Sequence, residues 1–218
     1  MEIVTGVIIL ITVIFSVILH EIAHGLVAER LGDPTARLQG RLTLDPRKHI
    51  DPFMTILLPI LTFFSTGMVL GAAKPVPIDP FNFREARKDT ALVSIVGPLT
   101  NILIAVIAAV ILHLLRYATP SIGQGPYDFI FFILYPILLT VAQINLSLGI
   151  FNLIPIPPLD GSKIFALLLP EREAAIYVSL GSVGFFIILF LFMVPIGGFS
   201  LSNLIFNLLS FSEKLLGI

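Results

Sequence analysis

Long uncharged stretches dominate this sequence and restrict what it can fold into. Of its 218 residues, 56% are hydrophobic and only 12% are charged, and its mean hydropathy is +1.01. A run of about 18 or more apolar residues is typical of a membrane-spanning helix. We therefore expect an all-α polytopic membrane protein, with a single integral-membrane domain over residues 1–218. The stretches without Asp, Glu, Lys or Arg are residues 3–19, 52–73, 91–112, 129–159 and 174–212.

The path of residues 52–73 decides the topology. This stretch is long enough to span a membrane, but Pro59, Gly67 and Gly71 interrupt it. Nine of the thirteen Lys and Arg residues lie between residues 30 and 88, on both of its sides. Because basic residues gather on the cytoplasmic side, we expect a re-entrant segment, with a plain spanning helix as the alternative. In total we expect about four to six membrane segments.

A small β-hairpin is expected near residues 35–44. Residues 35–38 and 41–44 are short alternating runs on either side of Gln39-Gly40. Such runs around an x-Gly turn favour a hairpin. An irregular loop at the membrane surface is the alternative.

The first apolar stretch ends in His20-Glu21-Ile22-Ala23-His24, which has the pattern HExxH. In a helix, His20 and His24 lie one turn apart on the same face and can bind one zinc ion. Glu21 lies beside the first of them and can take a proton from a water molecule there. The pattern also occurs by chance, but polar groups in a membrane helix are costly without a function. We therefore predict a metal site with Glu21 as general base.

Asp160 is the candidate for a third ligand, because a catalytic zinc site needs three protein ligands. It follows Pro155-Ile156-Pro157-Pro158, which must break the preceding helix. If residues 52–73 are re-entrant, Asp160 reaches the same membrane face as the two histidines. If they span, it lies on the opposite face. The metal site and the distribution of basic residues thus favour the same topology. Asp160 could also act as the N-cap of a helix over residues 161–169.

These motifs together resemble the site-2 protease family of intramembrane zinc metalloproteases, in its small bacterial branch without PDZ or CBS domain. The motifs are HExxH, then GPLTN ending at Asn101, then NLIPIPPLDG beginning at Asn152. The resemblance implies one zinc ion per chain, with Glu21 as general base and acid. It implies that Asn152 steadies the oxyanion or the substrate backbone, and it makes Asn101 a second candidate for such a role. The implied zinc ligands are His20, His24 and Asp160.

The resemblance implies an endopeptidase that hydrolyses bonds within or near transmembrane segments of other membrane proteins. Its expected surroundings are the lipid bilayer of a bacterial cell membrane, with the active site near the cytoplasmic face. The alternative is a zinc transporter or a non-catalytic metal-binding membrane protein, which would not need a non-ligating Glu21. A net charge of −1 gives no basis for nucleic-acid binding. The sequence does not identify the substrate or the oligomeric state. It also does not determine whether residues 199–217 cross the membrane.

Overall fold

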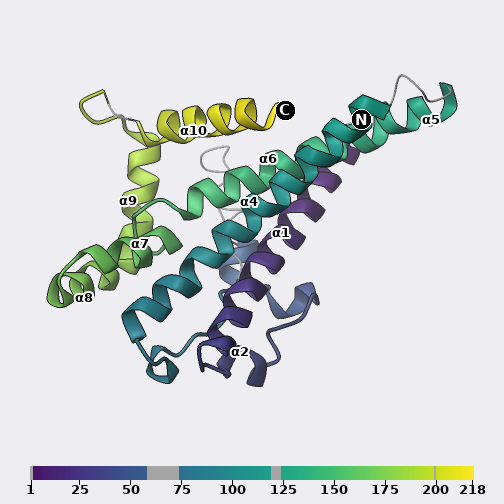
Figure 1. The fold of residues 1–218 in the computed structure, drawn as a ribbon. Coiled ribbons are helices and arrows are strands. Elements are labelled where there is room, and N and C mark those ends of the chain that lie inside the picture. Colours follow the sequence, from purple (N-terminus) through teal and green to yellow (C-terminus); the bar gives the residue numbers. More distant parts are fainter. Residues whose placement is uncertain (1, 58–73, 119–123, 199) are drawn as a thin grey trace.

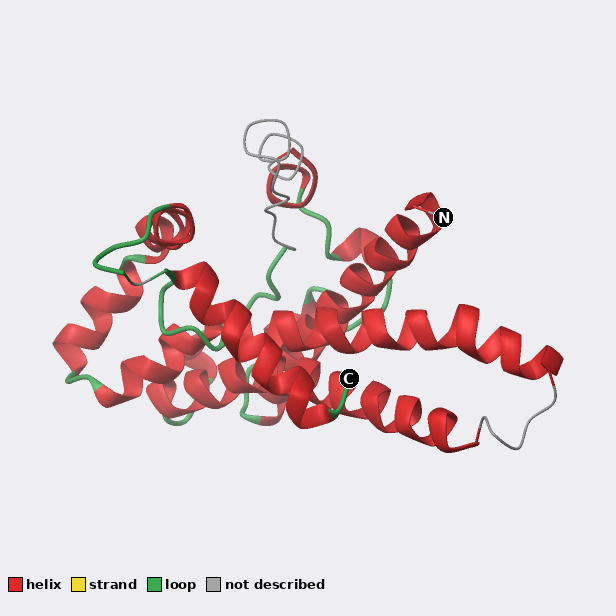
Figure 2. Ribbon diagram, turned by 90° about the horizontal axis from the view of Figure 1, so that it is seen from above, coloured by secondary structure: helices red, strands yellow, loops and turns green. Residues whose placement is uncertain are grey.

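Helices form the framework of this protein in the computed structural model, which describes residues 2–57, 74–118, 124–198 and 200–218. The longest are α1 (Glu2–Arg30), α4 (Ala86–Ala118) and α6 (Tyr135–Asn152) (Figure 1). No strand is found in these ranges (Figure 2). The shorter elements are α2 (Thr35–Leu38), η1 (Pro46–Lys48), η2 (Pro52–Leu57), η3 (Pro80–Asn82), α5 (Gln124–Phe129), η5 (Ile130–Leu134), α7 (Asp160–Phe165), η6 (Ala166–Leu168), α8 (Glu171–Ser179), α9 (Gly181–Met193) and α10 (Leu201–Leu216).

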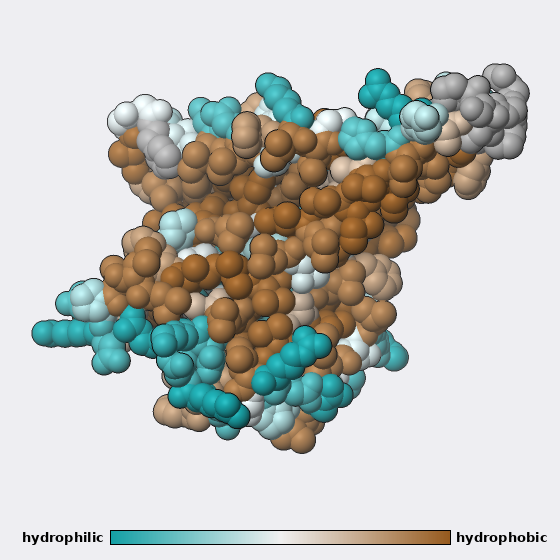
Figure 3. Space-filling model, in the orientation of Figure 1, coloured by the Kyte–Doolittle hydropathy of each residue, from teal (hydrophilic) through white to brown (hydrophobic). Residues whose placement is uncertain are grey.

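Three helical stretches among the described residues are long and apolar enough to cross a membrane: Ile3–Arg30, Ala86–Ala118 and Tyr127–Asn152. A fourth crossing results if α8 and α9, bent by 71° where they meet, count as one span. Figure 3 shows the resulting hydrophobic band between two more hydrophilic edges. The prediction of an all-α integral membrane protein is confirmed. The expected re-entrant path of residues 52–73 falls mostly on residues 58–73, which lie outside the described ranges.

The helices α1, α4 and α6 pack against one another through small residues, which is how membrane helices approach closely. Ala105, Ala108 and Ala142 are buried between them. Gly149 of α6 faces α4, where a Cβ atom would lie 2.8 Å from Ile102 Cγ1. This close packing brings polar side chains of all three helices together inside the apolar bundle.

The hairpin expected at residues 35–44 is wrong. Residues 35–38 form the short helix α2, and Arg41 N donates to Ala36 O across Gly40, whose φ is 62°. The cause is the buried Asp33, whose carboxylate accepts hydrogen bonds from the backbone N–H and the hydroxyl of Thr35. Local side-chain bonds of this kind compete with strand pairing.

Asp33 also anchors a distant segment. Its Oδ2 accepts from Asp79 N at 2.8 Å and its Oδ1 from Asn82 Nδ2 at 2.8 Å. Burial alone would raise the pKa of Asp33, but the hydrogen bonds from Thr35, Asp79 and Asn82 outweigh it and hold the pKa below its ordinary value. The ionised carboxylate thereby ties residues 79–82 to the end of α1.

The C-terminal part of α10 contacts two longer helices, α4 near its end and α6 near its middle. His113 Nε2 of α4 donates to Leu216 O at 2.6 Å, and Gln143 Nε2 of α6 donates to Glu213 Oε1 at 3.0 Å. The 16 residues of α10 cover about 24 Å, which is shorter than a hydrocarbon core of about 30 Å. A helix that lies in the membrane interface therefore fits the length of α10 better than a membrane crossing.

Candidate metal centre

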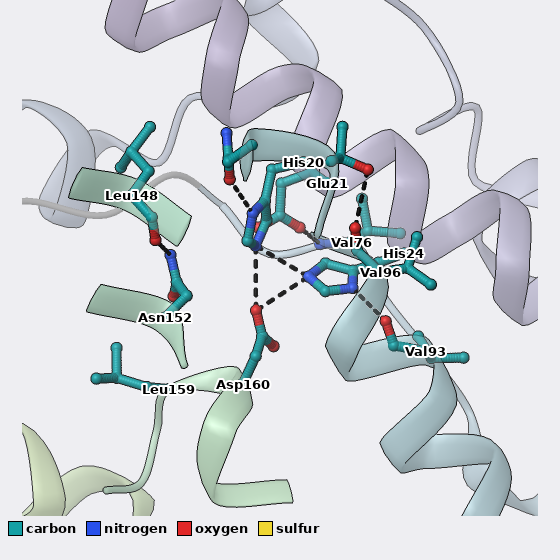
Figure 4. Close-up of polar contacts among 12 residues, drawn as sticks. His20, Glu21, His24, Val76, Val93, Val96, Leu148, Asn152, Leu159 and Asp160 are labelled. Atoms are coloured by element: carbon teal, nitrogen blue, oxygen red, sulfur yellow. Dashed lines mark hydrogen bonds and ion pairs between the residues drawn. The ribbon is translucent and has the colours of Figure 1, made fainter. Parts of the chain in front are cut away.

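Three buried side chains from distant parts of the sequence meet beside α1 (Figure 4). His20 and His24 come from α1 and Asp160 begins α7, with exposed fractions of 6%, 6% and 8%. The two Nε2 atoms lie 3.1 and 3.2 Å from Asp160 Oδ2, and 3.0 Å from each other. The structure thus brings together the three residues that were predicted as zinc ligands.

The non-helical segment after α6 places Asp160 beside His20 and His24. Residues 153–159 are not helical, and Leu159 has extended φ and ψ angles of −64° and 155°. Leu159 is therefore the N-cap of α7, and the N-cap role considered for Asp160 is wrong. The helix α7 packs mainly against α4, and its first turn lies against residues 153–154 of the break. Gly161 makes this packing possible, since a Cβ atom there would overlap the backbone of Leu153.

The outer ring nitrogens of both histidines have fixed acceptors. His24 Nδ1 lies 2.7 Å from the backbone carbonyl of Val93, which can only accept, so Nδ1 carries the proton. His20 Nδ1 lies 2.6 Å from Asn101 Oδ1 and donates to it. In a neutral imidazole the other nitrogen is then a bare acceptor. When both rings are neutral, as metal binding requires, both Nε2 lone pairs therefore face Asp160 Oδ2.

A second asparagine fixes the orientation of the first. Asn101 Nδ2 donates to Asn145 Oδ1 at 2.9 Å, and Asn145 Nδ2 donates to Ser16 Oγ at 2.8 Å and to Val141 O at 2.9 Å. Asn101 and Asn145 are both 0% exposed. Sequence reasoning missed Asn145, although an amide in the middle of an uncharged membrane stretch is costly unless it has a partner.

The three converging atoms fit a metal ion. Two bare nitrogens and a carboxylate oxygen repel one another unless a cation, or a second proton on one ring, lies among them. Their separations of 3.0, 3.1 and 3.2 Å approach the roughly 3.3 Å expected for ligands of one tetrahedral zinc with bonds of about 2.0 Å. Two histidines and a carboxylate are also an established donor set for catalytic zinc.

Gly97 of α4 leaves room for the two rings. A Cβ atom on Gly97 would overlap Nε2 of both His20 and His24. At Gly97, the helix α4 therefore leaves the space that the two imidazole rings occupy, in addition to supplying their hydrogen-bond acceptors. This gives the first residue of the GPLTN motif a steric role at the centre, which sequence reasoning did not predict.

Glu21 lies next to the ligands without joining them. It is half-buried, and its Oε2 accepts a hydrogen bond from Val76 N at 2.6 Å. Val76 belongs to the non-helical residues 74–79, and this segment is held by Arg41 Nη2, which donates to Lys74 O at 2.6 Å. Burial lowers the pKa of the Arg41 guanidinium, and the charge of Glu21 partly offsets this. The backbone of residues 74–76 thus orients the predicted general base.

The two asparagines assigned to substrate binding are placed differently. Asn101 lies behind His20, as described above. Asn152 is half-buried near the end of α6, where its Nδ2 donates to Leu148 O of the same helix at 3.0 Å. The structure therefore joins Asn101 to the ligand cluster and leaves Asn152 beside it.

The sequence pattern of Peptidase family M50 matches residues 8–125 and 120–195, which is most of the chain. The protein belongs to peptidase family M50. The matched ranges contain both α1 with its HExxH motif and α7 with Asp160. The resemblance to the site-2 protease family stated from the motifs is thereby confirmed.

Curated proteins similar to this chain are named as zinc metalloproteases. YwhC of Bacillus subtilis, named as a presumed zinc metalloprotease, is 39% identical over 197 residues, covering 88% of this chain and 82% of YwhC. Rip2 of Mycobacterium tuberculosis, named likewise, is 32% identical over 162 residues, covering 74% of this chain but only 57% of Rip2. The names of these relatives give no support to the transporter alternative. No solved structure matches the chain.

The asparagine pair behind His20 makes a testable contribution to metal binding. Asn145→Leu removes the shorter of the two hydrogen bonds that Asn101 Nδ2 donates and leaves the one to Ser16 O at 3.4 Å. The Asn101 amide is then held less firmly, and so is the tautomer of His20. We expect zinc affinity to fall about 10- to 100-fold, as for other groups that orient a metal ligand. Competition with a chromogenic chelator measures this. Ser147→Leu is the control and should keep wild-type affinity, because Ser147 is half-buried on the same helix and its hydroxyl donates to Gln143 O of that helix. Equal affinity of the two variants would contradict this role.

Proposed function

We propose that this M50 peptidase is an intramembrane zinc endopeptidase that hydrolyses peptide bonds within or near transmembrane segments of other membrane proteins. The observation that carries the proposal is the convergence of two bare imidazole nitrogens and a carboxylate beside a glutamate that does not ligate. A storage or transport site would need the three ligands but not Glu21. The whole of residues 1–218 forms one membrane domain in this proposal.

In the proposed mechanism, His20, His24 and Asp160 hold one zinc ion per chain. When bound there, zinc would lower the pKa of a water molecule and would polarise the scissile carbonyl. Glu21 accepts the proton from that water and later gives it to the leaving amine. Val93 O and Asn101 Oδ1 keep the imidazole rings in the tautomer that ligation requires.

Other groups of the chain would act on the substrate. A transmembrane helix hides its peptide bonds in its own hydrogen bonds, so it must unwind locally before it is cleaved. Asn152, at the end of α6 and close to the break that delivers Asp160, is our candidate for steadying the exposed substrate backbone or the oxyanion.

We further propose that the active site lies near the cytoplasmic face of a bacterial cell membrane. Lys74 N donates to His49 O at 2.9 Å, so the residues that flank 50–73 lie side by side. This supports a segment that enters and leaves the membrane on one side. The basic residues on both flanks support the cytoplasmic side.

Cysteine labelling tests this topology cleanly, because the chain contains no cysteine. Single cysteines at Lys48 and Lys74 should both react with an impermeant reagent in inside-out vesicles, and neither should react in intact cells. A cysteine at Thr5, near the start of α1, is the reference for the opposite side. Labelling of Lys48 and Lys74 from opposite sides would refute the re-entrant path.

The activity itself is tested by incubating purified protein of measured zinc content with a transmembrane reporter in detergent or liposomes. Cleavage should require about one zinc per chain, stop when a chelator removes the metal, and return when zinc is added back. Zinc binding without cleavage of any member of a reporter panel, together with zinc uptake into liposomes, would favour a transporter instead.

A further inference from the structure

A cavity of about 220 Å³ opens beside the metal centre. One wall consists of Val76, Ile78 and Pro80, and the opposite wall of Thr90, Val93 and Ser94 at the start of α4. Lys163 of α7 closes a third side. Nothing in the mechanism above uses this space.

Each wall of the cavity touches a different member of the site. Val76 N donates to Glu21, and Val93 O accepts from His24. Lys163 Nζ lies 3.4 Å from Asp160 Oδ1. Residues that line the cavity therefore bond directly to the predicted general base and to two of the three predicted ligands. A peptide whose carbonyl reaches the metal centre has its neighbouring side chain within a few ångströms, since one residue of extended chain covers about 3.5 Å.

The size and the lining restrict what could enter. An apolar cavity of about 150 Å³ holds a benzene ring, so about 220 Å³ accommodates a leucine or phenylalanine side chain. Four of the lining residues, Val76, Ile78, Pro80 and Val93, are apolar. A basic side chain would meet the charge of Lys163, and an acidic one would compete with Asp160 for it. An apolar side chain is not repelled by Lys163 and does not compete with Asp160 for it.

We propose that this cavity is the subsite that receives the side chain of a substrate residue next to the scissile bond, and that it selects apolar side chains of about the size of leucine or phenylalanine. The proposal rests on the peptidase function proposed above. Thr90, Ile78 and Lys163 are then residues that determine specificity, although none of them belongs to the ligand set.

Disulfide trapping in an inactive variant tests the placement of the substrate side chain. The cleavage position in a reporter is first mapped with the wild-type enzyme. Thr90→Cys is then introduced into the zinc-loaded Glu21→Gln variant, where it is the only thiol. Reporters with one cysteine at successive positions should crosslink most strongly at a single position adjoining the scissile bond. Leu92→Cys, whose side chain is 52% exposed on the same helix, is the control. Yields no higher than this control at every position would overturn the subsite.

Specificity provides the second test. Thr90→Phe fills the cavity, so we expect kcat/KM to fall about tenfold or more for reporters with leucine or phenylalanine at the trapped position. Reporters with alanine there should stay within about twofold of wild type. Ile78→Ala widens the cavity and should shift the preference among reporters toward phenylalanine. Leu92→Phe, outside the cavity, should leave kcat/KM and this preference as in the wild type.

The outcomes separate the two proposals. Failure of the wild-type enzyme to cleave any reporter would refute the proposed function. A different result would refute the subsite alone. In that case the wild type cleaves, Thr90→Phe and Ile78→Ala bind zinc normally, and each variant changes kcat/KM by the same factor for every reporter.

Discussion

Glu21→Gln is expected to abolish cleavage while leaving the metal bound. The amide cannot accept the proton of the attacking water, and general-base catalysis contributes about 10²- to 10⁴-fold to rate. The amide oxygen can still accept the hydrogen bond from Val76 N, so the substitution leaves the orientation of residues 74–76 intact. The reporter assay gives kcat/KM, and elemental analysis of the same samples gives the zinc content.

Glu173→Gln makes the same chemical change on the exposed surface of α8 and should keep full activity. Two results would contradict the role of Glu21. Cleavage by Glu21→Gln at the wild-type rate would mean that another group moves the proton. Loss of zinc from Glu21→Gln would mean that the carboxylate acts in metal binding.

Gly97→Ala is expected to disrupt the metal centre through a single methyl group. The added Cβ atom would overlap Nε2 of both histidines, so the rings must turn away from Asp160 or α4 must move. Alanine favours a helix over glycine by about 1 kcal/mol, so a loss cannot come from weakening α4 itself. We expect zinc affinity to fall at least about 100-fold, beyond the usual effect of a group that only orients a ligand. Chelator competition measures the affinity.

Gly6→Ala is the matched control, because no atom lies within 4 Å of the corresponding position in α1. It should keep both wild-type zinc affinity and wild-type cleavage. If Gly97→Ala bound zinc as tightly as Gly6→Ala, the rings would have to be placed differently from the arrangement in Figure 4.

Local patterns were sufficient to predict the helices that cross the membrane. The uncharged stretches predicted α1, α4 and α6, because apolar length alone selects helices inside a bilayer. Turn chemistry was a weaker guide. The hairpin near Gly40 was wrong because the buried Asp33 draws Thr35 into a helical turn and also holds residues 79–82.

Local patterns were sufficient to predict the three residues that meet at the candidate centre. His20 and His24 share a helix face because they are four residues apart, and Asp160 follows a break that three prolines impose. The hydrogen bonds and the space around these residues depend on tertiary contacts that local patterns do not predict. Val93 and the Asn101–Asn145 pair hold the outer ring nitrogens of the two histidines. Gly97 leaves the space that the two rings occupy. The cavity forms where residues 76–80 lie against α4. These contacts join residues far apart in the chain, and helix packing, which no local pattern encodes, brings them within hydrogen-bonding distance.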